Sequence, residues 1–306
     1  MTAEIDFSRP LGATLRVLRA CLPEEIWNSP ENWGIYHRFL PHILAVSSYH
    51  SGRNLTDSEA TAWMLNQAGR YLRRQGRPTE ALPLNERALR IYRAVRGNDH
   101  SDVADALNAV GRVLMDLGRP VTALPLHQEA LRILELLYPA DNPDIAVSLN
   151  DVGWALSALG RTEDALPLHQ RALRIHETAY SADHPALGTT LNYLGWTLSA
   201  LDRPGEALPL HRRALSIHSA VYGPSNHQVA IHINNSGRAL SALGRSEEAL
   251  PLHERALRIH EAAYGPEHPD VAIDLRELGR TLSALGRAEE ALPLHQRALR
   301  IEEDSH

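Results

Sequence analysis

The chain of 306 residues contains no lysine, so all 31 of its basic side chains are arginine. This absence excludes two kinds of chemistry. A phosphate-binding P-loop needs a lysine next to its Ser or Thr, and Schiff-base or lysine general-base catalysis needs a primary amine. A GC-rich coding sequence is the simpler explanation of the arginine bias, ahead of selection for a function.

Cysteine and long apolar runs are also scarce. Cys21 is the only cysteine, so neither an intrachain disulfide nor a cysteine-rich zinc site can form, which favours a reducing compartment. The N-terminal stretch carries charges between Glu4 and Arg19 and has no apolar core of the kind a signal peptide needs. No run approaches the roughly 18 apolar residues of a membrane span. We therefore expect a soluble cytoplasmic protein that has no membrane partner.

The charge balance and the motifs exclude further functions. A formal net charge of −6 gives the surface no basic footprint of the kind that nucleic acid requires. The signatures of zinc proteases, serine hydrolases and dinucleotide-binding proteins are missing. His176-Glu177 and His260-Glu261 begin like the zinc-protease motif but lack its second histidine. We predict a non-enzymatic protein that binds no nucleic acid and needs no cofactor and no metal.

What the chain does contain is a strict internal repeat. The tripeptide Leu-Pro-Leu is present six times, always 42 residues apart, with its prolines at Pro83, Pro125, Pro167, Pro209, Pro251 and Pro293. A unit of this length cannot bury its apolar face alone and stacks on its copies. We therefore predict an α-solenoid, with an N-terminal helical segment over 1–56 and six tandem repeats over 57–306.

Each unit has the pattern of two antiparallel helices. In the third unit Leu149, Val152 and Leu156 form one helical stripe, Gly160 suits a left-handed helix end, and Thr162 suits the N-cap of the second helix. The Leu-Pro-Leu proline lies beyond the first turn of the second helix, where it predicts a bend. First helices are predicted over 58–75, 101–117, 143–159, 185–201, 227–243 and 269–285, and second helices over 78–95, 120–138, 162–179, 204–221, 246–263 and 288–302.

These units resemble the tetratricopeptide repeat. The residues of the third unit that match the family pattern are Leu149, Val152-Gly153, Leu156, Ala165, His169 and Ala172. The resemblance covers about 57–302 and implies an all-α, right-handed superhelix whose first helices line the concave face. The period of 42 exceeds the usual length of about 34 and resembles the kinesin-light-chain variant. Histidine replaces the family's second-helix aromatic residue in five units, and Asn85 replaces it in the first.

Two rows of candidate binding residues lie on the predicted concave face. The first row is Asn66, Asn108, Asn150, Asn192 and Asn234, ended by Arg276. An amide both donates and accepts, so such a row can bind the backbone of an extended peptide, as the resemblance also implies. Alternatively, each asparagine bonds a neighbouring helix.

The second row lies one helical turn further on. It consists of Arg70, Arg112, Trp154, Trp196, Arg238 and Arg280, with Arg73, Tyr193 and Arg276 beside it. Trp and Arg are the residue types that dominate binding hot spots. The row predicts a locally positive groove that binds a protein or peptide segment with acidic residues outside an apolar or aromatic centre. Alternatively, the tryptophans only pack against the neighbouring repeat.

Histidines form another visible row. They are His127, His169, His211, His253 and His295, and His176, His218 and His260 follow three of them seven residues later. Two residues seven apart on a helix lie roughly 10 Å apart along its axis, too far to share one metal ion. We therefore predict that the first set packs between helices, with a pH response as the remaining alternative.

The segment 1–56 lies outside the repeat. Its helical pattern runs over Trp33–Ser51, and Leu40-Pro41-His42 is similar to the stretch that precedes such repeats in bacterial signal-transduction NTPases of the STAND/NB-ARC type. That similarity implies an alternative function, the sensor part of a signalling NTPase whose nucleotide-binding domain is not in this chain. After Ile301 no polar helix covers the last repeat, so self-association through repeat ends is a third hypothesis.

Overall fold

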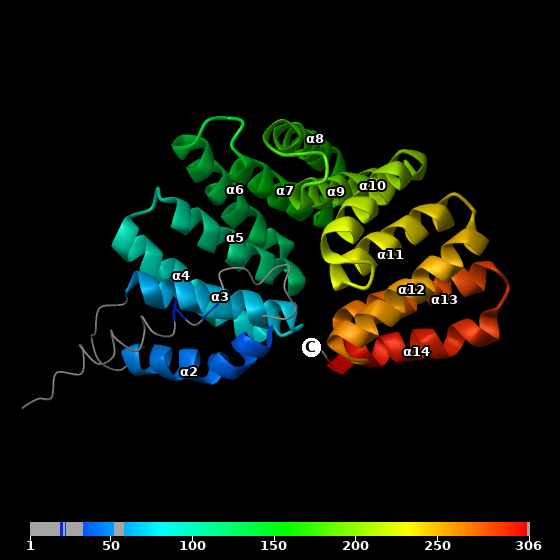
Figure 1. Cartoon of the computed structure of the whole chain (residues 1–306), viewed down its shortest axis with the longest axis horizontal. Coiled ribbons are helices and arrows are strands. Elements are labelled where there is room, and N and C mark those ends of the chain that lie inside the picture. Colours follow the sequence, from blue (N-terminus) through cyan, green and yellow to red (C-terminus); the bar gives the residue numbers. More distant parts are fainter. Residues whose placement is uncertain (1–18, 21, 23–32, 52–57, 305–306) are drawn as a thin grey trace, which may run out of the picture. The chain divides into compact units, whose positions relative to one another are not determined.

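The computed structural model describes residues 19–20, 22, 33–51 and 58–304, and within them the chain is all-α (Figure 1). The remainder of the expected segment 1–56 and the last two residues lie outside this description. The helices are α2 (Trp33–Ser51), α3 (Glu59–Arg74), α4 (Pro78–Arg96), α5 (Ser101–Asp116), α6 (Pro120–Leu137), α7 (Pro143–Ala158), α8 (Thr162–Ala179), α9 (Pro185–Ala200), α10 (Pro204–Tyr222), α11 (His227–Ala242), α12 (Ser246–Tyr264), α13 (Pro269–Ala284) and α14 (Ala288–Asp304). The predicted repeat helices are confirmed, with ends that differ by at most two residues.

The helices from α3 onward form six consecutive pairs, one for each 42-residue repeat, and the protein is a repeat solenoid. The chain divides into two compact units, which we call the N-terminal unit (Met1–Tyr138) and the C-terminal unit (Pro139–His306). Repeats one and two, with α2, belong to the N-terminal unit. Repeats three to six, from α7 to α14, belong to the C-terminal unit.

The turn inside each repeat has a common cause. After α7, the Gly160 N–H donates to the Ser157 carbonyl and the Arg161 N–H donates to the Leu156 carbonyl, at 3.0 and 2.9 Å. Gly160 has a φ of +76°, the left-handed conformation that this helix end requires. In the fourth repeat Asp202 occupies the same place with a φ of +57°. The expected glycine end is confirmed, and one repeat achieves it with aspartate.

The expected N-cap at Thr162 is wrong. The helix α8 already begins at Thr162, and the cap position falls on Arg161, whose side chain makes no capping bond. The reason is that the glycine turn leads directly into the second helix and leaves one residue between them. Arg161 instead bonds the carboxylate of Asp164, Nε to Oδ2 at 2.8 Å.

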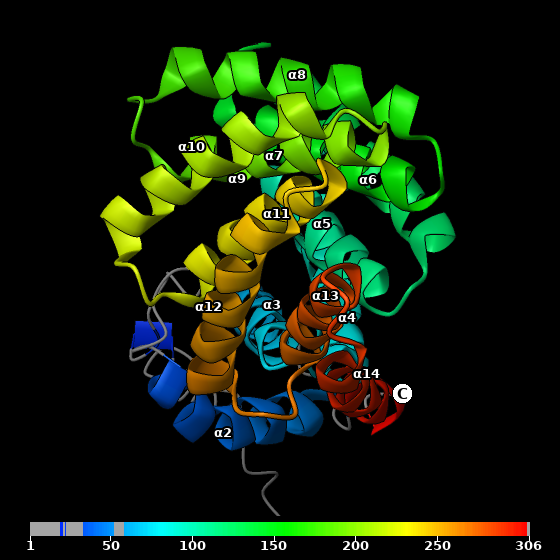
Figure 2. The same ribbon diagram turned by 90° about the vertical axis from the view of Figure 1, so that its right-hand side faces the viewer.

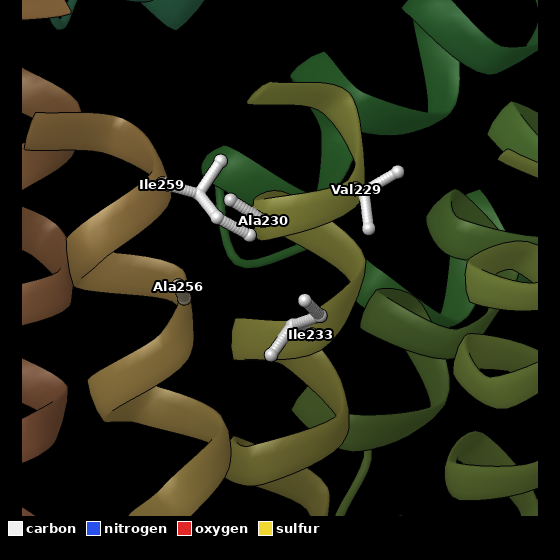
Figure 3. Packing of buried hydrophobic residues seen from close by; sticks show 5 residues of the cluster. All are labelled: Val229, Ala230, Ile233, Ala256 and Ile259. Atoms are coloured by element: carbon white, nitrogen blue, oxygen red, sulfur yellow. The ribbon is translucent and has the colours of Figure 1, made fainter. Parts of the chain in front are cut away.

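Apolar side chains join the two helices of a repeat. In the fifth repeat Val229, Ala230 and Ile233 of α11 pack with Ala256 and Ile259 of α12 (Figure 3). All five are buried, and Leu215 of the preceding repeat packs against them. Similar clusters lie in the fourth to sixth repeats, and each includes a side chain from a neighbouring repeat, as stacking in a solenoid requires.

The first helices form one layer of the C-terminal unit. The backbones of α7 and α9, α9 and α11, and α11 and α13 approach one another closely, whereas those of α8, α10, α12 and α14 do not. The second helices are joined by long side chains, as in the ion pairs Arg213–Glu177 and Arg297–Glu261. In Figure 2 α11 lies beside α12, its partner in the repeat. The first helices are therefore closer together than the second helices, and their side away from the second helices is the inner face of this unit.

The six second helices each continue through their Leu-Pro-Leu proline. Proline lacks the N–H that would bond the carbonyl four residues earlier. The predicted bend at these six positions stays a prediction.

The helix expected over Trp33–Ser51 is confirmed as α2, which continues through Pro41. It packs on α3, where the ring of Tyr36 stacks on that of Tyr71 with centroids 5.8 Å apart and planes 20° apart. Tyr36, Leu40 and Ile43 are buried in this contact. The helix therefore covers one side of the first repeat.

Candidate interaction surface

A histidine, an asparagine and a glycine interlock the two helices of a repeat. His169 of α8 lies against Gly153 of α7, and its Nδ1 is 2.9 Å from Oδ1 of Asn150. Because the carbonyl of Asn150 can only accept, the histidine donates from Nδ1. The same pairs are His127–Asn108 at 2.9 Å, His211–Asn192 at 3.1 Å and His253–Asn234 at 2.5 Å.

The last repeat keeps the histidine beside the glycine, since His295 lies against Gly279. In the first repeat Asn85 replaces the histidine and lies beside Gly69. The structure therefore supports the packing interpretation of the histidine row. Burial lowers the pKa of His169, His211 and His253 to about 4, which keeps these rings neutral at physiological pH.

The asparagine row is already engaged within the protein. The carbonyl oxygens of Asn108, Asn150, Asn192 and Asn234 accept from the histidines, which is the alternative that the sequence left open. The Nδ2 of Asn150 also donates to Thr190, at 2.7 Å. Among the described residues, Nδ2 of Asn192 and Nδ2 of Asn234 have no acceptor. Peptide binding by this row stays a prediction, and these two donors are the atoms that it would use.

The two tryptophans have different surroundings. Trp154 of α7 lies beside Tyr193 of α9, with ring centroids 6.4 Å apart. Tyr193 in turn stacks on His169, at 5.7 Å and 3°. Trp196 of α9 stacks on no other described ring. Both tryptophans are partly exposed. Trp154 thus packs against the next repeat in part, and Trp196 presents its indole without such a contact.

In the N-terminal unit, acidic residues neutralise the candidate arginines. Asp105 of α5 bonds Arg70 and also accepts from Nδ2 of Asn66, the latter at 3.0 Å. Asp116 bonds Nε of Arg73 at 2.5 Å. These pairs join α3 to α5. The expectation of a locally positive surface therefore does not hold around Arg70 and Arg73. Arg112 lies on α5.

In the C-terminal unit, two candidate arginines share one carboxylate. Oε1 of Glu277 is 3.1 Å from Nη1 of Arg280 and 3.7 Å from Nε of Arg238. Glu277 is buried, whereas Arg280 is exposed and Arg238 is partly exposed. Arg276 pairs with Glu302, at 2.6 Å. Two positive charges face one negative charge, so an excess positive charge remains at Arg238 and Arg280.

Sequence reasoning missed two parts of this face. The first part is Glu277, the carboxylate that Arg238 and Arg280 share. The other is an apolar row seven residues before the Trp/Arg row, formed by Val147, Ile231 and Ile273. Val147 and Ile273 are 38% and 39% exposed. A residue seven positions earlier lies on the same side of a helix, so this spacing was the signal that could have revealed the row.

The structure thus arranges the predicted residues of the C-terminal unit in order along successive first helices. Trp154, Trp196, Arg238 and Arg280, which we call the inner row, lie on α7, α9, α11 and α13 at equivalent positions. The first part of the row is aromatic and the second part is cationic. The remaining predicted residues, Asn66, Arg70, Arg73, Asn108 and Arg112, lie on α3 and α5 of the N-terminal unit.

A tetratricopeptide repeat family model matches residues 60–135, 102–178, 158–220, 203–262 and 227–304. The chain belongs to this family. Its architecture is that of a repeat module for protein interactions. A comparison with curated protein sequences gave no match.

Solved structures share the fold of this tetratricopeptide repeat protein. The TPR-like repeats of a Podosopora anserina chain described as a kinesin light chain are 21% identical, with a TM-score of 0.52 over 68% of this chain and 98% of that one. BtubC from P. vanneervenii is 23% identical, with a TM-score of 0.55 over 76% and 91%. RapI is 17% identical, with a TM-score of 0.65 over 88% and 92%.

Two features are absent from the described residues. None of the helices there combines the length and the apolar character needed to cross a bilayer. No group of three or more His, Cys, Asp or Glu side chains in this part of the chain converges to hold a metal ion.

Proposed function

We propose that the inner face of the C-terminal unit binds an extended peptide or protein segment without catalysing a reaction. The observation that carries this proposal is the inner row itself, in which two tryptophans and two arginines occupy one helical position in four successive repeats. Trp and Arg contribute most to binding hot spots. The face that they share has no covering helix in the described residues of this unit.

The order of aromatic and cationic side chains along the inner row indicates which side chains a bound peptide should carry. An apolar or aromatic side chain fits beside Trp154 and Trp196, and a carboxylate fits at Arg238 and Arg280, where positive charge is in excess. The acidic flank is therefore expected on one side of the apolar centre. Neighbouring helices pack about 8–10 Å apart and an extended chain advances about 3.3 Å per residue, so a spacing of roughly three residues would reach from Trp196 to Arg238.

Binding of defined peptides tests this proposal. The probe is a fluorescein-labelled Gly/Ser peptide with one Trp and, three residues later, one Asp, measured by fluorescence anisotropy. We expect the Kd to rise at least tenfold in Trp154→Ala/Trp196→Ala and in Arg238→Ser/Arg280→Ser. The matched control Arg258→Ser/Arg300→Ser removes the same charge from exposed positions of the second helices and should bind as the wild type does.

A pull-down from the native lysate extends the test to natural partners. Wild type, the tryptophan variant and the control variant serve as baits, and each must first show an unchanged melting temperature. If all three capture the same proteins, the inner face is not the binding surface.

The second candidate function is the sensor part of a signalling NTPase whose nucleotide-binding domain is not in this chain. The observation that favours it is α2, a helix with an internal proline that packs on the first repeat, as the Leu40-Pro41-His42 similarity implies. A parent reading frame that encodes a P-loop lysine upstream would support this candidate, and a frame that starts at Met1 would oppose it.

Self-association through the last repeat is a separate proposal. Leu292 and Leu299 of α14 are 58% and 55% exposed. Their equivalents one repeat earlier, Leu250 and Leu257, pack against α13 of the following repeat. A second copy of the chain would cover the exposed leucines. Light scattering over a concentration series should then show a rising mass for the wild type and a constant mass for Leu292→Glu/Leu299→Glu.

A further inference from the structure

Three buried histidines connect successive repeats of the C-terminal unit. Each lies near the end of a second helix and bonds a residue 14 positions later, on the first helix of the next repeat. Nδ1 of His176 bonds Thr190 at 2.9 Å, Nδ1 of His218 bonds Nε2 of His232 at 2.6 Å, and Nδ1 of His260 bonds Asp274 at 2.6 Å. The three contacts join equivalent positions, but the chemistry of the partner differs.

The hydrogen bonds of His218 determine where its protons are. Its Nε2 is 2.9 Å from the carbonyl oxygen of Pro185, which can only accept, so Nε2 carries a hydrogen. In the neutral ring Nδ1 is then an acceptor, and it receives the hydrogen of His232 Nε2. His218 thereby connects α9 of its own repeat with α11 of the next, through two neutral imidazoles.

No carboxylate bonds this pair among the described residues. From α10 it is faced by His211 and by Tyr222, whose ring meets that of His218 edge-on at 5.4 Å. The contribution of α9 is the Pro185 carbonyl, and on α11 the Ser236 hydroxyl bonds the backbone of His232. Burial lowers the pKa of both rings, and for His232 the neighbouring His218 and His211 lower it further.

The next contact has the opposite electrostatics. His260 and Asp274 are both buried, and Nε2 of His260 also bonds the carbonyl of His227 at 3.2 Å. Burial alone would lower the pKa of His260, but the hydrogen bond and charge of Asp274 outweigh it and raise the pKa. A proton therefore strengthens the contact between repeats five and six, whereas it opposes the contact between repeats four and five.

We propose that the His218–His232 contact is an acid-sensitive hinge between the fourth and fifth repeats. When α10 and α11 separate, both rings reach water and can take up protons, so acid favours the open state. The hinge lies between Trp196 and Arg238, and opening it would separate the aromatic and cationic parts of the inner row. That consequence rests on the proposed function, whereas the hinge itself does not.

Amide hydrogen exchange of the unliganded full chain at pH 7.5 and pH 5.5 tests the hinge, after correction for the intrinsic exchange rates. A ring with an ordinary pKa of about 6.5 in the open state favours opening by about tenfold over this interval. The hinge holds two such rings, so we expect protection in α10 and α11 to fall about a hundredfold more than in α12 and α13. His211 and His253 occupy equivalent positions in the two segments. The buried His227 of α11 contacts Tyr264 and His260 of α12, outside the hinge, and stays in place in the variants of His232. An equal fall in both segments overturns the proposal.

Two substitutions transfer the other contacts of this chain to the hinge. His232→Asp copies the His260–Asp274 pair and should abolish the excess loss of protection at pH 5.5. His232→Thr copies the His176–Thr190 pair, removes one of the two imidazoles and should give an intermediate loss. If His232→Asp loses as much protection in α10 and α11 as the wild type, the proposal is wrong. If that variant fails to fold, His232→Thr and the wild-type comparison still decide.

Discussion

A methyl group on Gly153 would lie 2.5 Å from two atoms of the His169 ring, Cε1 and Nε2. The absence of a side chain at Gly153 is therefore the condition under which His169 reaches Asn150. The same relationship recurs in Gly111 with His127, Gly195 with His211, Gly237 with His253 and Gly279 with His295. Repeats two to six each close on a glycine that accepts an imidazole, whereas Gly69 of the first repeat faces Asn85. Four predictions can be tested by measurement.

Gly153→Ala should destabilise the protein. The new methyl group must displace the buried His169 ring, and overpacking of this kind costs about 1–3 kcal/mol. Urea unfolding measures the change. The matched control is Gly205→Ala, since a Cβ at this exposed helical glycine meets nothing within 4 Å. Alanine is the better helix former, so the control should be unchanged or more stable by up to about 1 kcal/mol. A variant Gly153→Ala with wild-type stability would contradict this close contact.

Acid should weaken the fold. Burial lowers the pKa of His169, His211 and His253 from 6.5 to about 4, so their contribution to stability is present above pH 6.5 and is lost as the pH falls toward 4. One pKa unit corresponds to about 1.4 kcal/mol, so the free energy of unfolding should fall by roughly 1 kcal/mol per histidine between pH 7.5 and 5.5.

Urea unfolding at the two pH values measures this loss. His253→Gln should reduce the pH dependence, because glutamine can bond Asn234 without titrating in this range. His37→Gln changes an exposed histidine of α2 and should leave the pH dependence as it is. Equal stability of the wild type at both pH values would remove the histidine row as a source of pH sensitivity.

Glu277→Gln should strengthen the binding of acidic peptides. The isosteric amide removes the negative charge that Arg238 and Arg280 share, so both arginines become available to a ligand carboxylate. Partly exposed ion pairs contribute up to about 1 kcal/mol, which corresponds to roughly a fivefold lower Kd for the Trp/Asp peptide. The same peptide with Asn in place of Asp should bind the variant and the wild type equally. An unchanged Kd for the Asp peptide would mean that its carboxylate does not reach these arginines.

Pro167→Ala should stabilise the third repeat. Alanine restores a backbone N–H in the interior of α8 and removes the clash of the proline ring, an effect of up to about 3 kcal/mol in a helix. The control Pro204→Ala replaces a proline at the first position of α10, where no hydrogen bond is missing, and should change stability by less than about 1 kcal/mol. Thermal unfolding distinguishes the two. No gain in Pro167→Ala would indicate that the stacked repeats already accommodate this proline.

The histidine and asparagine rows show how much of the candidate site was predictable. The packing of His169 followed from its place in the repeat pattern, since that position is local and recurs at a fixed period. The hydrogen bond between His169 and Asn150 could not be predicted from the histidine row or the asparagine row alone. A constant separation of 19 residues between asparagine and histidine, kept in four repeats, was the available signal. It joins two helices, so its meaning depends on how they pack.

The sequence by itself determined the number of repeats, the bounds of their helices to within two residues and the membership of the family. These features depend on apolar periodicity and on turn residues such as Gly160, which act over a few neighbouring positions. The tertiary structure alone decided which polar side chains remain available to a partner. Asp105 neutralises Arg70, and Arg238 and Arg280 share Glu277. His218 bonds His232. All of these contacts except Glu277–Arg280, which lies within α13, form because stacking brings separate helices together. Charge and hydrogen-bond pairing act through space, and a repeat pattern along the chain does not encode them.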